Sequence, residues 1–159
     1  PGKIAFSKCI IFIAEGDGGV EIADVRNIEM PEKVNELSVD SINDICIKGV
    51  LAYAVANDRL SILDVSDSKR IKKITSKKVG YKIRNILQNK DRIYIAGSRN
   101  ISSFDITQPG NLMWEIEYEL IEGIENIFVG DDGNIYVAAG SDGLRVLIID
   151  EKNKKTIQD

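Results

Sequence analysis

Short, mostly apolar segments recur along the chain at a nearly constant spacing, and each carries an aromatic residue at its third position. These segments span 10–14, 51–55, 92–96 and 134–138. The aromatic residues Phe12, Tyr53, Tyr94 and Tyr136 are separated by 41, 41 and 42 positions. A repeat of this length indicates that one supersecondary unit is used four times.

The same pattern of apolar and polar positions surrounds each aromatic residue. A short apolar run precedes it, and an alternating run that usually ends near an Asp follows it. The preceding runs are 4–6, 45–47, 86–87 and 127–129, and the alternating runs are 20–25, 60–65, 101–106 and 144–150. A more amphipathic segment closes each unit, near 33–39, 71–77, 113–120 and 153–158. Gly, Asn and Asp between the runs favour hairpin turns, so each unit is predicted to hold four short strands.

Four-stranded units of this length are typical of β-propeller blades, because a single twisted sheet can cover its faces only by stacking on copies of itself. We therefore predict an all-β fold, a β-propeller or a segment of one, with four antiparallel blades. The chain is predicted to be one propeller domain, or part of one, over 1–159, with approximate blades 1–40, 41–82, 83–123 and 124–159.

The sequence does not fix the number of blades in the complete ring. Three arrangements stay open: a segment of a larger propeller completed by another chain or segment, a closed four-bladed ring, and a dimer of half-rings. An array that does not close would expose the apolar faces of its first and last blades, which favours association.

Three of the alternating runs resemble the LVIVD repeat. They are G-V-E-I-A-D-V (19–25), L-S-I-L-D-V-S (60–66) and G-L-R-V-L-I-I-D (143–150). The third unit departs from the pattern, since Ile106 replaces the Val and the Gly-rich turn is missing. The resemblance implies a propeller-blade repeat found in many bacterial and archaeal proteins, often surface or secreted ones. It implies no single activity, because function resides in sites carried by a fold.

Composition supports β structure and narrows the chemistry. Ile occurs 26 times and Val 11 times, and such β-branched residues suit strands. A net charge of −4 argues against nucleic-acid binding, and no apolar stretch approaches the length of a membrane helix.

The chain has no His, which removes the commonest general base and the usual metal ligand. Cys9 and Cys46 are expected to be buried, inert thiols, with a disulfide between them as the lesser option.

Function is expected to be non-enzymatic: a protein-interaction or scaffold module within a larger propeller or assembly, placed at a cell surface by the family resemblance alone. The partner is expected to be another protein, a chain or segment that completes the ring, or a second copy. Two alternatives remain open: a propeller enzyme, a hydrolase or lyase whose catalytic residues lie outside this chain, and a propeller that binds a small ligand or cation.

The candidate binding residues come from loops and turns. The loop between the second and third units carries Tyr81, Lys82 and Arg84, an aromatic and cationic group suited to a carboxylate or a protein surface. The same loop could be a plain tether between blades. Further candidates are Arg59, Arg99 and Trp114. Trp114 could instead pack beneath a neighbouring turn.

No cofactor is expected, and we expect the acidic side chains to have structural roles. The acid-rich turns 15–19, 131–134 and 140–143 could hold Ca²⁺, but hairpin turns explain their composition better. Glu115, Glu117 and Glu119 alternate along a predicted outer strand and are expected to face solvent. Asp24, Asp64 and Asp105 are expected to bond locally in the turns that follow them.

Overall fold

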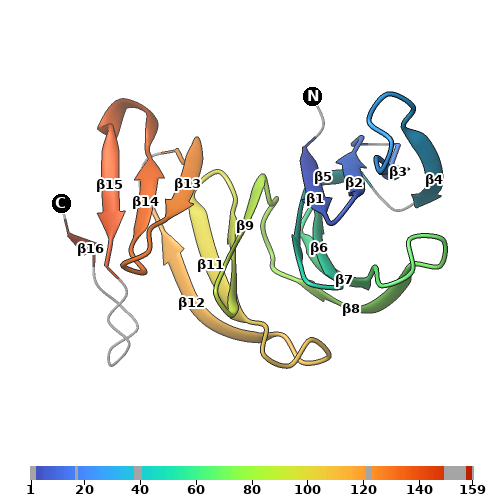
Figure 1. Cartoon of the computed structure of the whole chain (residues 1–159). Helices are drawn as coiled ribbons and strands as arrows, with labels where there is room; N and C mark the ends of the chain where they lie inside the picture. The colour runs from blue at the N-terminus through green and yellow to red at the C-terminus, as the bar shows by residue number, and fades with distance from the viewer. Residues whose placement is uncertain (1–2, 17, 38–40, 121–122, 149–156, 159) are drawn as a thin grey trace. The chain divides into compact units, whose positions relative to one another are not determined.

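The computed structural model describes residues 3–16, 18–37, 41–120, 123–148 and 157–158, and these residues form an all-β protein. Within these ranges, sixteen strands form four sheets, each of four antiparallel strands in sequence order (Figure 1). The predicted all-β class and the division into four four-stranded units are confirmed. The alternation of short apolar runs with Gly, Asn and Asp turns is the physical basis of this architecture.

The four sheets follow one another along the chain. Sheet 1 contains β1 (Ile4–Ser7), β2 (Ile10–Ala14), β3 (Val20–Asp24) and β4 (Glu32–Leu37). Sheet 2 contains β5 (Ile42–Lys48), β6 (Leu51–Ala56), β7 (Arg59–Asp64) and β8 (Lys72–Lys78). Sheet 3 contains β9 (Asn85–Asn89), β10 (Arg92–Ala96), β11 (Asn100–Asp105) and β12 (Met113–Glu119). Sheet 4 contains β13 (Asn126–Val129), β14 (Ile135–Ala138), β15 (Leu144–Leu147) and β16 (Ile157–Gln158).

The first three sheets share their irregularities as well as their strands. A register shift interrupts the pairing of the third and fourth strands at Ile22/Ala23, Ile62/Leu63 and Ser103/Phe104. A bulge increases the local twist of a strand pair. The first hairpin turns also match, because Lys8, Gly49 and Lys90 lie 41 residues apart and all have positive φ, at 56°, 62° and 51°.

The chain divides into two compact units, residues 1–86 and 87–159, each with its own apolar core. The core of the first unit lies between sheets 1 and 2, where Phe12 and Ile22 meet Ile45, Ala52 and Ala54. The core of the second unit lies between sheets 3 and 4 and includes Tyr94, Ile101, Ile127, Ile135 and Val137. The second strands of sheets 2 and 3, β6 and β10, are buried along most of their length.

Some local expectations need correction. Cys9 is exposed in the β1–β2 turn rather than buried, and Cys46 on β5 is half-buried; both thiols are free. Burial raises the pKa of the Cys46 thiol. Arg59 begins β7 rather than lying in a turn. The turn at Gly140–Asp142 is a short 3-10 helix. Of the expected fourth strand near 153–158, residues 153–156 lie outside the described residues.

Glu115 is also placed differently from the prediction of a solvent-facing row. Glu117 and Glu119 are exposed, but the Glu115 carboxylate is mostly buried and lies 2.6 Å from Nε of Arg92. In the part of the chain that the structure describes, no helix has the length and apolar character needed to span a membrane.

Candidate functional site

The loop that carries Tyr81, Lys82 and Arg84 is fixed to sheet 2 by the residue in its middle. Ile83 is fully buried and donates its backbone N–H to the Asn57 carbonyl at 2.6 Å, while the Asn43 side-chain amide donates to the Ile83 carbonyl at 3.1 Å. The Val79 N–H adds a bond to the Asp58 carbonyl at 2.8 Å. The loop therefore lies against the β6–β7 turn in a defined conformation.

This anchor is repeated in the other sheets, and sequence reasoning missed it. Ile42 and Ile124 are buried as Ile83 is, and their N–H groups donate to the carbonyls of Gly16 and Ser98. The three isoleucines are spaced by 41 residues, and so are the three acceptors. That spacing is visible in the sequence, so the signal was available. The repeated bond shows that the part of the loop at Ile83 has a structural role.

Lys82 and Arg84 flank the buried Ile83, and both are exposed. Along an extended segment, side chains alternate in direction, so burial of the middle residue turns its two neighbours toward solvent. Tyr81 is half-buried beside them. The loop thus presents two cations from a backbone that is held in place.

Arg59 lies at the same end of sheet 2, because it begins β7 directly after the β6–β7 turn. It pairs across the sheet with Lys78, and its guanidinium donates to Ser76 Oγ at 3.3 Å. Lys78 Nζ lies 3.1 Å from the Asp58 carboxylate. We call Arg59, Lys78, Lys82 and Arg84 the basic end of the first unit. Asp58 neutralises part of its charge, and the remainder suits an acidic partner.

Arg99 and Trp114 belong to the second unit and lie apart from each other. Arg99, in the β10–β11 turn, donates through Nε to the Leu120 carbonyl at 3.0 Å, and it lies 4.0 Å from Glu119. Trp114 is the second residue of β12 and lies at the opposite end of sheet 3. Its ring packs on Phe104 with centroids 5.1 Å apart, and its Nε1 donates to the Ile116 carbonyl. The six predicted residues therefore do not form one site, and four of them share one end of the first unit.

The strand-terminal aspartates have the local role expected of them. Oδ1 of Asp24, Asp64 and Asp105 accepts the backbone N–H two residues later, at 2.9, 2.9 and 2.7 Å. Hydrogen bonding from Arg26, Ser66 and Thr107 lowers the pKa of the respective carboxyl below 3.8. These carboxylates stabilise the turns that lead into the fourth strands.

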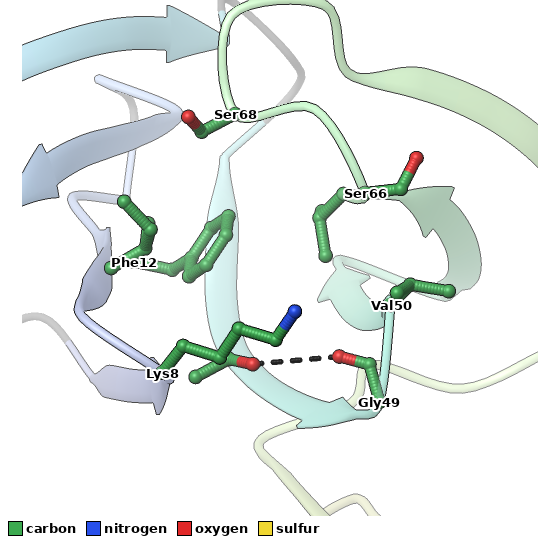
Figure 2. A pocket seen from close by; sticks show the side chains of 9 residues that line it. Lys8, Phe12, Gly49, Val50, Ser66 and Ser68 are labelled. Atoms are coloured by element: carbon green, nitrogen blue, oxygen red, sulfur yellow. Dashed lines mark hydrogen bonds between the residues drawn. The ribbon is translucent and has the colours of Figure 1, made fainter.

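A small hollow lies at the other end of the first unit, beside the β1–β2 and β5–β6 turns (Figure 2). Its volume is about 90 Å³, and Lys8, Phe12, Val50 and Ser66 contribute to its lining. The Lys8 side chain extends across the hollow in Figure 2, and Ser7 Oγ donates weakly to the Gly49 carbonyl at 3.4 Å. Pockets for drug-sized ligands are roughly 300–1,000 Å³, so this hollow suits a few water molecules.

The acid-rich turns use their described carboxylates internally. Asp132 accepts from the Asn134 N–H at 3.0 Å and from the Tyr136 hydroxyl at 2.9 Å, and Asp142 pairs with Arg145 at 2.9 Å. Asp17 lies outside the described residues. Among the residues that the structure does describe, no three His, Cys, Asp or Glu side chains gather closely enough to hold a metal ion. Calcium binding stays a prediction.

Comparison by sequence finds no matching family model and no matching curated protein. By structure, the chain is similar to a crystal structure of a Lactobacillus plantarum protein, with a TM-score of 0.81 and 14% identity. It is also similar to a functionally unknown protein from Desulfotomaculum acetoxidans, with a TM-score of 0.78 and 13% identity. The alignments cover 99% and 95% of this chain, but only 54% and 53% of those chains.

A third similar structure is the computationally designed protein Ika4, with a TM-score of 0.71 and 16% identity. Here the alignment covers 93% of this chain and 90% of the designed one. This chain therefore spans about half the length of the two bacterial structures and nearly the whole of Ika4. At these identities the likeness establishes a shared arrangement of four-stranded sheets and nothing about activity.

Proposed function

We propose that this chain is a non-enzymatic protein-interaction and scaffold module of the β-propeller type, in which each four-stranded sheet is a blade. The proposed blades are 1–40, 41–82, 83–123 and 124–159, and they form part of a larger ring or assembly. The repeat of about 41 residues supports this proposal, as do the two apolar cores between successive sheets. The alignment over about half of longer bacterial chains supports a ring with more blades than this chain supplies.

We also propose that the chain is a divergent member of the LVIVD-repeat family. The support is the alternating run that ends in Asp within β3 and β7, followed by the Asp side-chain turn at Asp24 and Asp64. Membership would place the protein at a cell surface or in a secreted assembly.

The proposed contact surface is the basic end of the first unit. The observation that carries this assignment is the burial of Ile83 between exposed Lys82 and Arg84. A loop held by two backbone–backbone hydrogen bonds and one from the Asn43 side chain loses little conformational entropy when a partner binds, so its cations are preorganised. Cationic groups of this kind recognise carboxylates on a partner. The proposed partner therefore presents an acidic surface or peptide.

A charge-reversal experiment tests the proposed contact surface. Fluorescence anisotropy would measure binding of a labelled hexaglutamate peptide to the wild-type chain and to the double variant Lys82→Glu/Arg84→Glu. We expect binding to weaken by about tenfold or more, and the wild-type affinity to fall as salt is raised.

The matched control is Lys69→Glu/Arg70→Glu, which makes the same change in charge at two exposed residues beyond the opposite end of sheet 2. The control should retain the wild-type affinity within about twofold, because its charges lie away from the basic end. Equal losses in the two double variants would show that only net charge matters. That result would reject the basic end as a specific surface.

A further inference from the structure

The outward face of sheet 1 is apolar and has no sheet packed on it among the described residues. Ile4 and Phe6 of β1 are 66% and 61% exposed, while Ala5 between them is buried against the core. On the same face, Ile13 and Ile11 of β2 lie opposite Ile4 and Phe6. Four large apolar side chains therefore form a continuous patch, which we call the leading face.

Sheet 4 has a corresponding apolar patch on its outward face. Phe128 of β13 and Leu144 of β15 are 65% and 68% exposed. Between them lies Tyr136 of β14, whose ring is 6.3 Å from that of Phe128 and which pairs with Val146. We call these four residues the trailing face.

Equivalent positions in the other sheets show which kind of surface the leading face and the trailing face can pack against. At the positions equivalent to the leading face, sheet 4 carries Ile127, Val129, Ile135 and Val137, all buried against sheet 3. Sheet 2 carries Ile45, Ala52 and Ala54 at such positions, all buried against sheet 1. A leading face is thus the kind of surface that packs on a preceding sheet.

Positions equivalent to the trailing face pack on the following sheet instead of the preceding one. Its equivalents in sheet 1 are Ala5, Phe12, Val20 and Ile22, and all four are buried against sheet 2. A trailing face therefore packs on the sheet that follows. One chain presents both halves of the same type of interface, so two copies can satisfy each other.

We propose that the occupant of these faces is a second copy of this chain: the trailing face of each copy packs on the leading face of the other. A two-fold axis relates the two contacts, so each copy uses both its leading face and its trailing face, and neither of these two faces remains exposed. The inference rests on the proposed propeller architecture and names a partner for it. The assembly would contain eight sheets.

The lengths of similar structures favour an assembly of this size. The alignments cover 54% of the Lactobacillus chain and 53% of the Desulfotomaculum chain, while they cover 90% of Ika4. The same four-sheet arrangement thus occurs in chains of about this length and in chains about twice as long. Two copies of the present chain together have about the length of one of the longer chains.

The first test is the solution mass of the purified chain, measured by light scattering after gel filtration at micromolar concentration. We expect twice the chain mass of 17.6 kDa. Phe6→Glu in the leading face and Leu144→Glu in the trailing face should each give the mass of one chain, because a charge would be buried in both contacts. Ile28→Glu is the control, since Ile28 is 82% exposed in the β3–β4 connection and belongs to neither face.

Mixing the two variants makes the test specific. A pair of one Phe6→Glu copy and one Leu144→Glu copy has both charges in one contact and leaves the other contact unaltered. The mixture should therefore regain dimers that neither variant forms alone, and this result also shows that both variants are folded. A wild-type mass of one chain would overturn the proposal, as would dimers of either variant alone or a mixture that stays monomeric.

The test of the dimer and the test of the proposed contact surface can fail independently of each other. A monomer that still binds hexaglutamate through Lys82 and Arg84 would reject only the second copy as the occupant. A dimer that binds the peptide equally well after charge reversal would reject only the basic end as the contact surface.

Discussion

At the scale of single residues, the structure contains a buried hydroxyl whose bonding capacity is unused. Ser103 Oγ on β11 is inaccessible and has no hydrogen-bond partner among the described residues. Ile22 and Ile62 occupy the equivalent positions in sheets 1 and 2 and are fully buried. A polar group in this position is costly because folding removes its bonds to water without replacing them.

We predict that Ser103→Ala raises the free energy of unfolding by about 1 kcal/mol, since an unsatisfied buried polar group costs roughly 1–3 kcal/mol. Chemical denaturation of the variant and the wild type gives the difference. Ser102→Ala is the control, because Ser102 is equally buried but does have a bonding partner, so that variant should lose stability. A loss of stability in Ser103→Ala would mean that its hydroxyl is satisfied after all.

The first hairpin turns provide a second test at this scale. Gly49 has φ of 62°, and a Cβ placed there would meet no heavy atom within 4 Å. Gly49→Ala should therefore lower the free energy of unfolding by about 1 kcal/mol through backbone strain alone. At the equivalent Lys8, with φ of 56°, the change to Gly should raise it by about 0.5 kcal/mol, because relief of strain outweighs the added freedom of the unfolded chain. Thermal melts of both variants would show shifts of opposite sign, and equal signs would contradict the argument.

At the scale of elements, a buried isoleucine and one backbone hydrogen bond tie the start of sheets 2, 3 and 4 to a turn of the preceding sheet. The pairs are Ile42 with Gly16, Ile83 with Asn57 and Ile124 with Ser98. The side chain and the N–H act together, because burial excludes water from the bond and the bond fixes the side chain in the core.

We predict that Ile83→Ala lowers the free energy of unfolding by about 2–5 kcal/mol, the usual range for truncation of a fully buried aliphatic side chain. Urea denaturation followed by circular dichroism measures the change. The neighbouring Lys82→Ala should change stability by less than about 0.5 kcal/mol, because its side chain is exposed. Similar values for the two variants would show that the loop is not anchored as described.

At the scale of the whole molecule, one carboxylate contacts segments that lie about 40 residues before and after it in the chain. Asp44 of β5 accepts the N–H of Ile45 at 2.8 Å and that of Ile86 at 3.1 Å, and it lies 3.8 Å from Lys3 Nζ. Its side chain is nearly buried, and this desolvation raises the pKa of the carboxyl above 3.8. The charged form is therefore less favourable in the folded protein than in the unfolded chain.

The sign of the resulting pH dependence follows from proton binding. A raised pKa means that the folded state holds the proton more tightly, so the contribution of Asp44 is greatest below pH 3.8 and declines as the pH rises through the folded value. In the Asp44→Asn variant, the amide that replaces the carboxyl does not ionise, so this contribution does not change with pH. The stability of the variant relative to the wild type should therefore increase as the pH rises from the acid range toward neutrality. Asn126, at an equivalent position, makes the same bond to its own following N–H, so Asn suits the site.

Thermal melts of both proteins across this pH range test the prediction. Asp24, Asp64 and Asp105 have lowered pKa values and act in the opposite direction, but they are common to both proteins and cancel in the comparison. A difference in melting temperature that stays constant with pH would show that Asp44 does not titrate in this range.

The strands and their grouping into units could be predicted from local patterns in the amino-acid sequence. Phe12, Tyr53, Tyr94 and Tyr136 all lie on second strands, as the periodicity required, because alternation and turn chemistry act locally and are legible in the order of residues. The roles of Asp24 and Asp64 were predictable for the same reason, since an Asp side chain reaches the N–H two residues later in any such turn.

Which sheet covers each apolar face depends on long-range packing and could not be predicted from these local patterns. Alternation shows that Ile4 and Ile127 belong to apolar faces, but it cannot show that one is exposed and the other buried. It also cannot show that Glu115 meets Arg92, that Cys9 is exposed, or that Ile83 anchors the loop between Lys82 and Arg84. These features depend on contacts between segments far apart in the chain, whereas periodicity records only the direction in which each side chain leaves its own strand.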